Sequence, residues 1–215
     1  MAQVFPRWLN RAPLALAGAG GLVSVFAVCT VWLFFSPRHT QVGYRPEQPV
    51  PYSHRLHVGE LGLDCRYCHV SVETSPIANV PPTQVCLNCH RVVGRESAKL
   101  APIRDSAARG QPMRWVRVHK LPEYVYFDHH AHVRAGVGCA SCHGRVDQME
   151  VVIQVEPLSM GWCLDCHRNP APHLRPVSRV TDMKWVVPPD NGAFAAKVRR
   201  ERGLAPPLSC TGCHR

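Results

Sequence analysis

Residues 127–143 read Phe-Asp-His-His-Ala-His-Val-Arg-Ala-Gly-Val-Gly-Cys-Ala-Ser-Cys-His, and Trp-Cys-Leu-Asp-Cys-His follows at residues 162–167. This stretch is a histidine cluster followed by two Cys-x-x-Cys-His motifs. The same order occurs earlier in the chain, with Tyr-Ser-His-Arg-Leu-His at 52–57, Cys-Arg-Tyr-Cys-His at 65–69 and Cys-Leu-Asn-Cys-His at 86–90. A fifth motif, Cys-Thr-Gly-Cys-His, occupies residues 210–214. Because this motif is typical of c-type haem attachment, the sequence predicts five covalently bound haems.

The spacing within each motif suits this chemistry. Two cysteines at i and i+3 lie on one face of a helical turn, where both can form thioethers with one porphyrin. The histidine at i+4 then lies beneath the iron as its proximal ligand. The predicted covalent residues are Cys65, Cys68, Cys86, Cys89, Cys139, Cys142, Cys163, Cys166, Cys210 and Cys213. The predicted proximal ligands are His69, His90, His143, His167 and His214.

Two further histidine pairs stand at matching positions ahead of the motifs. His54 and His57, and likewise His129 and His132, are three residues apart. On a helix such a pair projects from one face, so each pair can ligate two neighbouring irons. His130 would point away from that face. The sequence therefore predicts four distal ligands, two for each histidine pair.

The fifth distal ligand has three kinds of candidate. His119, on the segment entering the second cluster, is favoured, and His173, just beyond the fourth motif, is the alternative. Met149 and Met160 flank the fourth motif, and a methionine ligand would raise the potential of that haem.

Other readings of the cysteines explain less. Paired Cys-x-x-Cys units also form zinc sites, but zinc does not require a histidine after each second cysteine, and five units leave one without a partner. No βαβ pattern surrounds any pair, which disfavours a redox dithiol. A nitrite or hydroxylamine reductase needs an open iron position, and five motifs ending in histidine disfavour it. Only Cys29, in an apolar run, lies outside the motifs.

Composition indicates an interior built from cofactors. Twenty prolines and fifteen glycines interrupt the chain, and aromatic residues make up 7% of it. We therefore expect a mostly irregular fold with short helices packed around haems, plus one N-terminal transmembrane helix. A short amphipathic piece is expected at 103–108, and a strand or hairpin broken at Pro122 is expected over 115–127.

The formal charge of +10 would ordinarily suggest an anionic partner such as nucleic acid. Ten haem propionates would offset it, so no nucleic-acid binding is predicted. Arginine matches a carboxylate well, and Arg91, Arg168 and Arg215 each follow a haem histidine directly. These three are the sequence candidates for propionate partners, against the simpler reading of a solvated basic surface.

Seven segments follow from these patterns. They are a cytoplasmic N-terminus (1–12), a transmembrane anchor (13–35), a linker (36–51), a first dihaem module (52–100), a second linker (101–126), a second dihaem module (127–170) and a C-terminal segment with the fifth haem (171–215).

The apolar run is 23 residues long and carries no charge, enough to cross a bilayer. A cleaved signal peptide would have a shorter apolar region, so an uncleaved single-pass anchor is favoured. Arg7 and Arg11 precede it, as the positive-inside tendency expects. Because c-type haems are attached on the outer face of the bacterial cytoplasmic membrane, the haem domain is expected on the periplasmic side.

Three segments resemble the pentahaem cytochrome subunit of bacterial alternative complex III: Val-His-Lys-Leu-Pro-Glu-Tyr-Val-Tyr-Phe-Asp-His at 118–129, Ala-Gly-Val-Gly-Cys at 135–139, and Leu-Ser-Met-Gly-Trp-Cys at 158–163. More broadly, the paired modules resemble the cytochrome c3/c7 class. The resemblance covers most of residues 50–170 and is weaker over the linker and the tail.

This resemblance implies an electron-transfer subunit of a quinol:electron-acceptor oxidoreductase, in which quinol is oxidised by other subunits. The implied partners are an iron–sulfur subunit, integral-membrane subunits and a monohaem cytochrome, with a soluble carrier or terminal oxidase as acceptor. The catalytic site would then lie elsewhere in the complex. The main alternative is a membrane-anchored multihaem quinol dehydrogenase that acts by itself.

Overall fold

The computed structural model describes residues 4–214, and these fall into two compact units that divide between Gln41 and Val42. Residues 1–3 of the predicted cytoplasmic segment lie outside the described residues, as does Arg215.

The first unit is built on one long helix, α1 (Ala12–Phe34), preceded by η1 (Arg7–Arg11) and followed by α2 (Pro37–Thr40). A proline in the first turn of α1 suits a position where the backbone N–H has no helical acceptor. Its 23 residues extend roughly 34 Å at 1.5 Å per residue, slightly more than a bilayer's hydrocarbon core. Within the described residues it is the one helix long and apolar enough to cross a membrane. The prediction of a long apolar helix is thus confirmed, with the helix beginning and ending one residue before the predicted bounds of 13–35.

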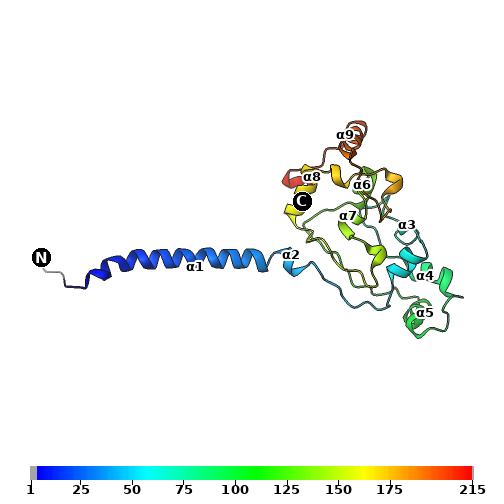
Figure 1. Cartoon of the computed structure of the whole chain (residues 1–215). Coiled ribbons are helices and arrows are strands. Elements are labelled where there is room, and N and C mark those ends of the chain that lie inside the picture. The colour runs from blue at the N-terminus through cyan, green and yellow to red at the C-terminus, as the bar shows by residue number, and fades with distance from the viewer. Residues whose placement is uncertain (1–3, 215) are drawn as a thin grey trace. The chain divides into compact units, whose positions relative to one another are not determined.

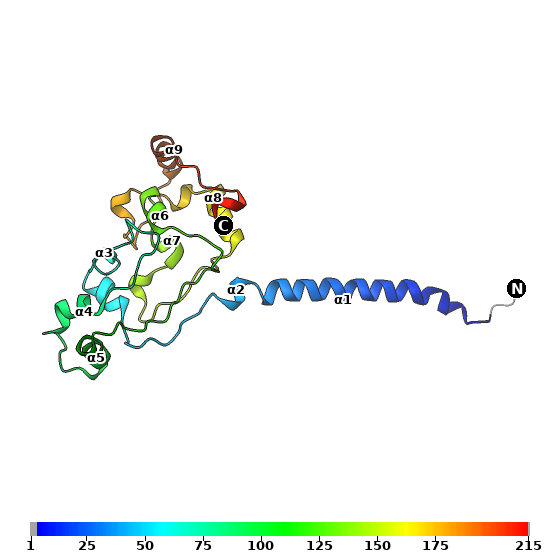
Figure 2. The same cartoon turned by 180° about the vertical axis from the view of Figure 1, so that it is seen from behind.

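The second unit consists of short helices joined by long irregular segments (Figures 1 and 2). Its α-helices are α3 (Cys65–Cys68), α4 (Thr83–His90), α5 (Ala101–Arg109), α6 (His129–Ala135), α7 (Ala140–His143), α8 (Met160–Arg168) and α9 (Asn191–Arg202). A π-helix, η2 (Arg55–Glu60), and the 3₁₀ turns η3 (Ala98–Leu100), η4 (Val146–Gln148), η5 (Ala171–His173), η6 (Val177–Arg179) and η7 (Cys210–Gly212) complete it. The architecture is compatible with the expected irregular, short-helix fold.

Local signals explain where several of these helices begin. Asp64, Asp128 and Ser159 each accept a hydrogen bond from a backbone N–H in the first turn of α3, α6 and α8. Such caps satisfy N–H groups that a helix leaves without acceptors. At its other end, α6 stops at Gly136, which has a left-handed φ of +92° that glycine adopts without strain. The amphipathic piece expected at 103–108 lies within α5.

The strand or hairpin expected over 115–127 is wrong. No strand occurs among residues 4–214, and the described β-pairing consists of two isolated bridges, Val125 with His214 and Val137 with Leu174. Instead of pairing with itself, the segment pairs with the fifth motif, where the Tyr126 N–H donates to the Cys213 carbonyl at 2.8 Å. A hairpin predicted from local alternation is replaced by a contact with residues almost ninety positions away.

The side-chain core of the described chain is small. Only seven apolar residues are buried: Val50, Ile103, Val133, Leu174, Val180, Ala195 and Val198. A conventional domain of this length buries far more apolar area, because that area offsets the entropy lost on folding. The polypeptide alone therefore lacks the interior that its size requires, as the composition suggested.

The predicted modules at 52–100 and 127–170 are in contact with each other. The backbone N–H of His129 donates to the Pro76 carbonyl, and the N–H of Arg55 donates to the Met149 carbonyl. Gly59 in the first module lies so close to Asp147 in the second that an added Cβ would be 2.3 Å from the Asp147 carbonyl oxygen. The histidines of the two modules thus occupy one compact unit.

Candidate functional site

Each Cys-x-x-Cys-His motif lies on or beside a helical turn, which brings its two cysteines to one side. The motifs coincide with α3, the end of α4, α7, the end of α8, and η7. None of the eleven cysteines, all of which lie within residues 4–214, forms a disulfide. Both Cys142 and Cys65 lie in the interior, where burial raises the pKa of Cys142 to about 12 and that of Cys65 to about 11.

Most of the candidate histidines are held by the same kind of hydrogen bond, from ring Nδ1 to a backbone carbonyl. A carbonyl oxygen can only accept, so Nδ1 carries the proton and Nε2 keeps a free lone pair. The bonds join His57 to Ser53 (2.8 Å), His69 to Asn79 (2.7 Å), His90 to Val93 (2.9 Å), His129 to Pro76 (2.9 Å), His132 to Asp128 (2.7 Å), His167 to Pro207 (2.7 Å) and His214 to Tyr124 (3.3 Å). This is the tautomer and orientation that metal-ligating histidines adopt.

The second histidine of each pair faces the histidine of a motif. The ring centroids of His57 and His90 are 6.1 Å apart, and those of His132 and His167 are also 6.1 Å apart. The two pairs come from different segments of the chain, so the repeated separation reflects a repeated arrangement.

One aromatic ring contacts both histidines of each pair. Tyr52 stacks on His57 at 4.4 Å and meets His54 edge-on at 4.8 Å. In the second module Phe127 stacks on His132 at 4.5 Å and meets His129 edge-on at 4.8 Å. Sequence reasoning missed this role, although an aromatic residue precedes the first histidine by two positions in both clusters.

The first histidine of each pair lies in a central cluster with the first motif of its module. His129 is stacked parallel to His143, with centroids 6.4 Å apart and planes 10° apart. His54 lies close enough to His69 for their charges to interact. Burial, followed by repulsion from neighbouring histidines, lowers the pKa of His143 to about 3 and that of His54 to about 4. These imidazoles are neutral at physiological pH, as ligation requires.

His119 joins the same cluster. Its ring is 4.4 Å from that of His143, and its Nε2 is buried without a hydrogen-bond partner. His173, the alternative, is part-buried and lies near Glu156 and Arg175. Met160 is 61% exposed, so its sulfur is not enclosed as an iron ligand would be.

The remaining predicted residues are His130 and the three arginines that follow motif histidines. Nε2 of His130 lies 3.2 Å from the Arg134 guanidinium. Arg91 is exposed, Arg168 pairs with Asp165 at 3.3 Å on the surface, and Arg215 lies outside the described residues. Sequence reasoning overlooked Arg175, which is only 5% exposed.

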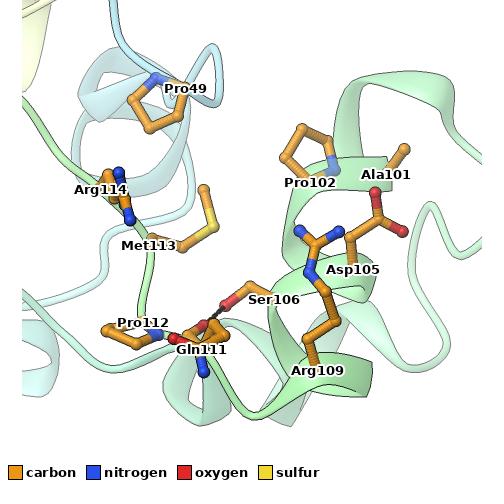
Figure 3. Close-up of a pocket in the computed structure, with 10 residues that line it drawn as sticks. All are labelled: Pro49, Ala101, Pro102, Asp105, Ser106, Arg109, Gln111, Pro112, Met113 and Arg114. Carbon is orange, nitrogen blue, oxygen red and sulfur yellow. Dashed lines mark hydrogen bonds between the residues drawn. The ribbon is translucent and has the colours of Figure 1, made fainter.

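A cavity of about 560 Å³ lies apart from these groups, between α5 and residues 111–114 (Figure 3). Asp105, Ser106 and Arg109 of α5 line one side, and Arg114 and Pro49 lie opposite. No cysteine or histidine lines it, so it is not part of the candidate site.

Among residues 4–214, no three histidine, cysteine or acidic side chains converge as the ligand set of a bare metal ion. The nitrogens are arranged as facing pairs instead. A haem iron receives four ligands from its porphyrin and needs only one or two from the protein. Paired imidazoles with free Nε2 atoms, next to helical cysteine pairs in an interior short of side chains, fit c-type haem.

These features point to the multihaem c-type cytochromes, and comparison with known proteins supports that class. No protein-family model matches the chain. The chain is similar to the multihaem cytochrome c subunit of menaquinone reductase from Nitratidesulfovibrio vulgaris, with 33% identity over 138 residues. The match covers 62% of this chain and 63% of the relative, so the chain spans less than two thirds of that protein.

Proposed function

We propose that this chain is a membrane-anchored pentahaem cytochrome that conducts electrons within a quinol:electron-acceptor oxidoreductase. The observation that carries the proposal is the repeated separation of facing histidines, 6.1 Å in both modules. Two imidazole–metal bonds of about 2.0 Å, with the distance from each nitrogen to its ring centre, give roughly 6.4 Å between centroids of axial ligands. Directly packed rings would be closer, as Tyr52 and His57 are.

Three ring separations and one close electrostatic contact suggest a histidine pair for four of the five haems. His57 and His90 would hold the haem attached at 86–90, and His132 and His167 the haem at 163–167. His129 with His143, and His54 with His69, would hold the haems of the first motif in each module. Each histidine pair then serves two haems, as expected for residues three positions apart.

His119 is the proposed distal ligand of the fifth haem. Its 4.4 Å separation from His143 leaves no room for an iron between the two rings, so it serves another iron. Its buried Nε2 is free. His119 lies shortly before Tyr124 in the chain, and the Tyr124 carbonyl accepts the Nδ1–H of His214.

When bound, the haems supply reversible one-electron chemistry, and the polypeptide supplies attachment, orientation and exclusion of water. The ten motif cysteines fix the porphyrins covalently. Carbonyl groups hold the imidazole protons on Nδ1 and aim Nε2 at the metal. Histidine on both faces leaves no open coordination position for a substrate, which suits a conductor rather than a catalytic haem.

The wider assignment follows the resemblance to alternative complex III. We place the haem unit on the periplasmic face of a bacterial cytoplasmic membrane, anchored by α1. Electrons would arrive from an iron–sulfur subunit, beside integral-membrane subunits, and leave to a monohaem cytochrome, a soluble carrier or a terminal oxidase. The similar Nitratidesulfovibrio protein belongs to a menaquinone reductase, so it serves the opposite direction of quinone chemistry. A chain of bis-histidine haems conducts electrons in either direction, and the reduction potentials of its partners decide the direction of flow.

One preparation tests these assignments. The chain is isolated from native membranes in mild detergent, its mass and low-spin haem content are measured, and co-purifying subunits are identified. We expect the added mass of five haems, a low-spin spectrum and iron–sulfur and integral-membrane partners. A chain without haem would refute the proposal, and a partner-free chain reduced directly by a quinol analogue would favour the stand-alone dehydrogenase.

A further inference from the structure

Arg175 is a buried cation without a counter-ion. Only 5% of its surface is exposed, and burial lowers the pKa of its guanidinium. Among residues 4–214, no carboxylate forms an ion pair with it. The charge of the nearby Asp182 carboxylate acts on Arg175, but its oxygens bind the Arg179 guanidinium at 2.6 Å and the Lys184 N–H at 2.9 Å rather than Arg175. An arginine stays charged in proteins, and an unpaired buried charge is strongly unfavourable.

The guanidinium is nevertheless held in a defined position. Nη1 donates to the Asp182 carbonyl at 3.0 Å, and Cζ lies 5.7 Å from the centre of the Trp185 ring. The opposite side is closed by Gly138, where an added Cβ would be 2.0 Å from Cζ. The backbone N–H of Arg175 also donates to the Gly136 carbonyl at 2.8 Å. A cation held in this way is preorganised to bind an anion, unlike a solvated arginine side chain.

Two hydrogen-bond donors at this position have no acceptor among residues 4–214. They are Nε of Arg175 and Nε1 of Trp185, and both are buried. Buried donors in folded proteins almost always have partners, so two in adjacent side chains indicate a missing acceptor. A guanidinium with a neighbouring indole N–H is suited to a carboxylate.

We propose that Arg175 and Trp185 bind a haem propionate, which rests on the proposed function. Arg175 is buried within the unit. The propionate of a haem bound in the interior therefore reaches it more readily than a carboxylate on a partner's surface. The Arg175 guanidinium lies against Gly138, the residue directly before Cys139, which is a predicted attachment residue. Propionates leave a porphyrin from the edge opposite its thioethers, so this propionate belongs to a haem other than the one attached at Cys139.

The test compares reduction potentials in the haem-loaded chain isolated from native membranes. Arg175→Met removes the charge while keeping most of the side-chain volume. We expect one haem to become harder to reduce, by about tenfold in its reduction equilibrium or ~59 mV for one electron, because a nearby positive charge is lost. Arg175→Lys should restore most of that shift. Trp185→Phe should give a smaller shift of the same haem in the same direction.

Arg179→Met is the matched control. Arg179 lies over the same Trp185 ring, at 5.8 Å, but its side chain is 57% exposed and is paired with Asp182. We expect the haem reduction potentials of Arg179→Met to match those of the unmodified chain. A second readout is the propionate bending mode in the resonance Raman spectrum, which should change in Arg175→Met and Trp185→Phe alone.

The possible results separate this inference from the proposed function. If the unmodified chain carries no haem, the function itself is wrong. If haem content is unchanged and every potential in Arg175→Met equals that of the unmodified chain, the propionate assignment is wrong. The assignment also fails if Arg175→Met loses a co-purifying subunit while its own potentials stay constant, because the carboxylate is then a partner's. Should Arg175→Met fail to accumulate, Trp185→Phe and Arg175→Lys decide by the same criteria.

Discussion

The two histidine clusters of this protein have similar ring distances, although their backbones adopt different helical conformations. In the first module His54 is the N-cap of the π-helix η2 and His57 lies within it, whereas both histidines of the second module lie on the α-helix α6. Yet the distance from the second histidine to the facing motif histidine is 6.1 Å in both, and the aromatic stacking distances differ by 0.1 Å (4.4 against 4.5 Å). Ring placement is therefore set by something other than helix type.

Two local contacts account for this agreement. In each module the second histidine donates its Nδ1–H to the carbonyl four residues before it, that of Ser53 or Asp128. The side chains of these same two residues accept a backbone N–H three positions later. The modules differ in their ring planes, which are 64° apart for His57 and His90 but 32° apart for His132 and His167. We therefore expect equal ligation but distinguishable low-spin spectra.

The largest expected effect comes from removing one of these histidines. His57→Ala and His132→Ala should each convert one haem from low to high spin and leave the other haems unchanged, because each ring faces a single motif histidine. Electron paramagnetic resonance of the oxidised chain measures this, and the lost low-spin signal should differ between the two variants. His130→Ala is the control, since its ring contacts Arg134 rather than a motif histidine. Loss of two low-spin haems from one substitution would contradict the pairing.

Replacing the aromatic rings should have the next largest effect. Tyr52→Leu and Phe127→Leu each remove one stacked and one edge-on contact, and an aromatic pair is worth about 0.5–1.5 kcal/mol beyond its buried area. We expect a lower denaturation midpoint and broadened low-spin signals in both variants. Tyr52→Phe keeps the ring and loses only the hydroxyl, so its signals should stay narrow. Equal damage from Tyr52→Phe and Tyr52→Leu would show that the hydroxyl, not the stack, matters.

The capping side chains should contribute less. Asp128→Ala and Ser53→Ala each remove an acceptor for a first-turn N–H, which costs about 1 kcal/mol for a typical cap. Both should lower the urea midpoint, whereas Asp128→Ser should stay close to the unmodified chain. If only Asp128→Ala is destabilising, the two clusters are not equivalent at this position.

Sequence reasoning succeeded where the pattern is local. The motif turns and the histidine pairs depend on residues three or four positions apart, and helix geometry brings such residues together. It failed where a contact joins distant segments. The Pro76 carbonyl that orients His129 carries no signature in the sequence, because any residue has a carbonyl. Arg175 looked like one basic residue among many, and only its burial against Gly138 distinguishes it from the arginines that follow the motifs.

The smallest predicted difference concerns the first motif of each module. Asp64 caps α3, whereas α7 begins without a side-chain cap. Hydrogen bonds from Arg66, and one from Thr181, lower the pKa of Asp64 to about 2. A carboxyl whose pKa is lower in the folded state stabilises the protein above its unfolded value near 3.8, and that contribution disappears as pH falls towards 2. Asp64→Asn should therefore lower the thermal midpoint slightly at pH 7 and converge with the unmodified chain near pH 2, because exposed ion pairs contribute little. Differential scanning calorimetry across this range checks it, and a deficit that persists at pH 2 would show that the effect does not come from the Asp64 charge.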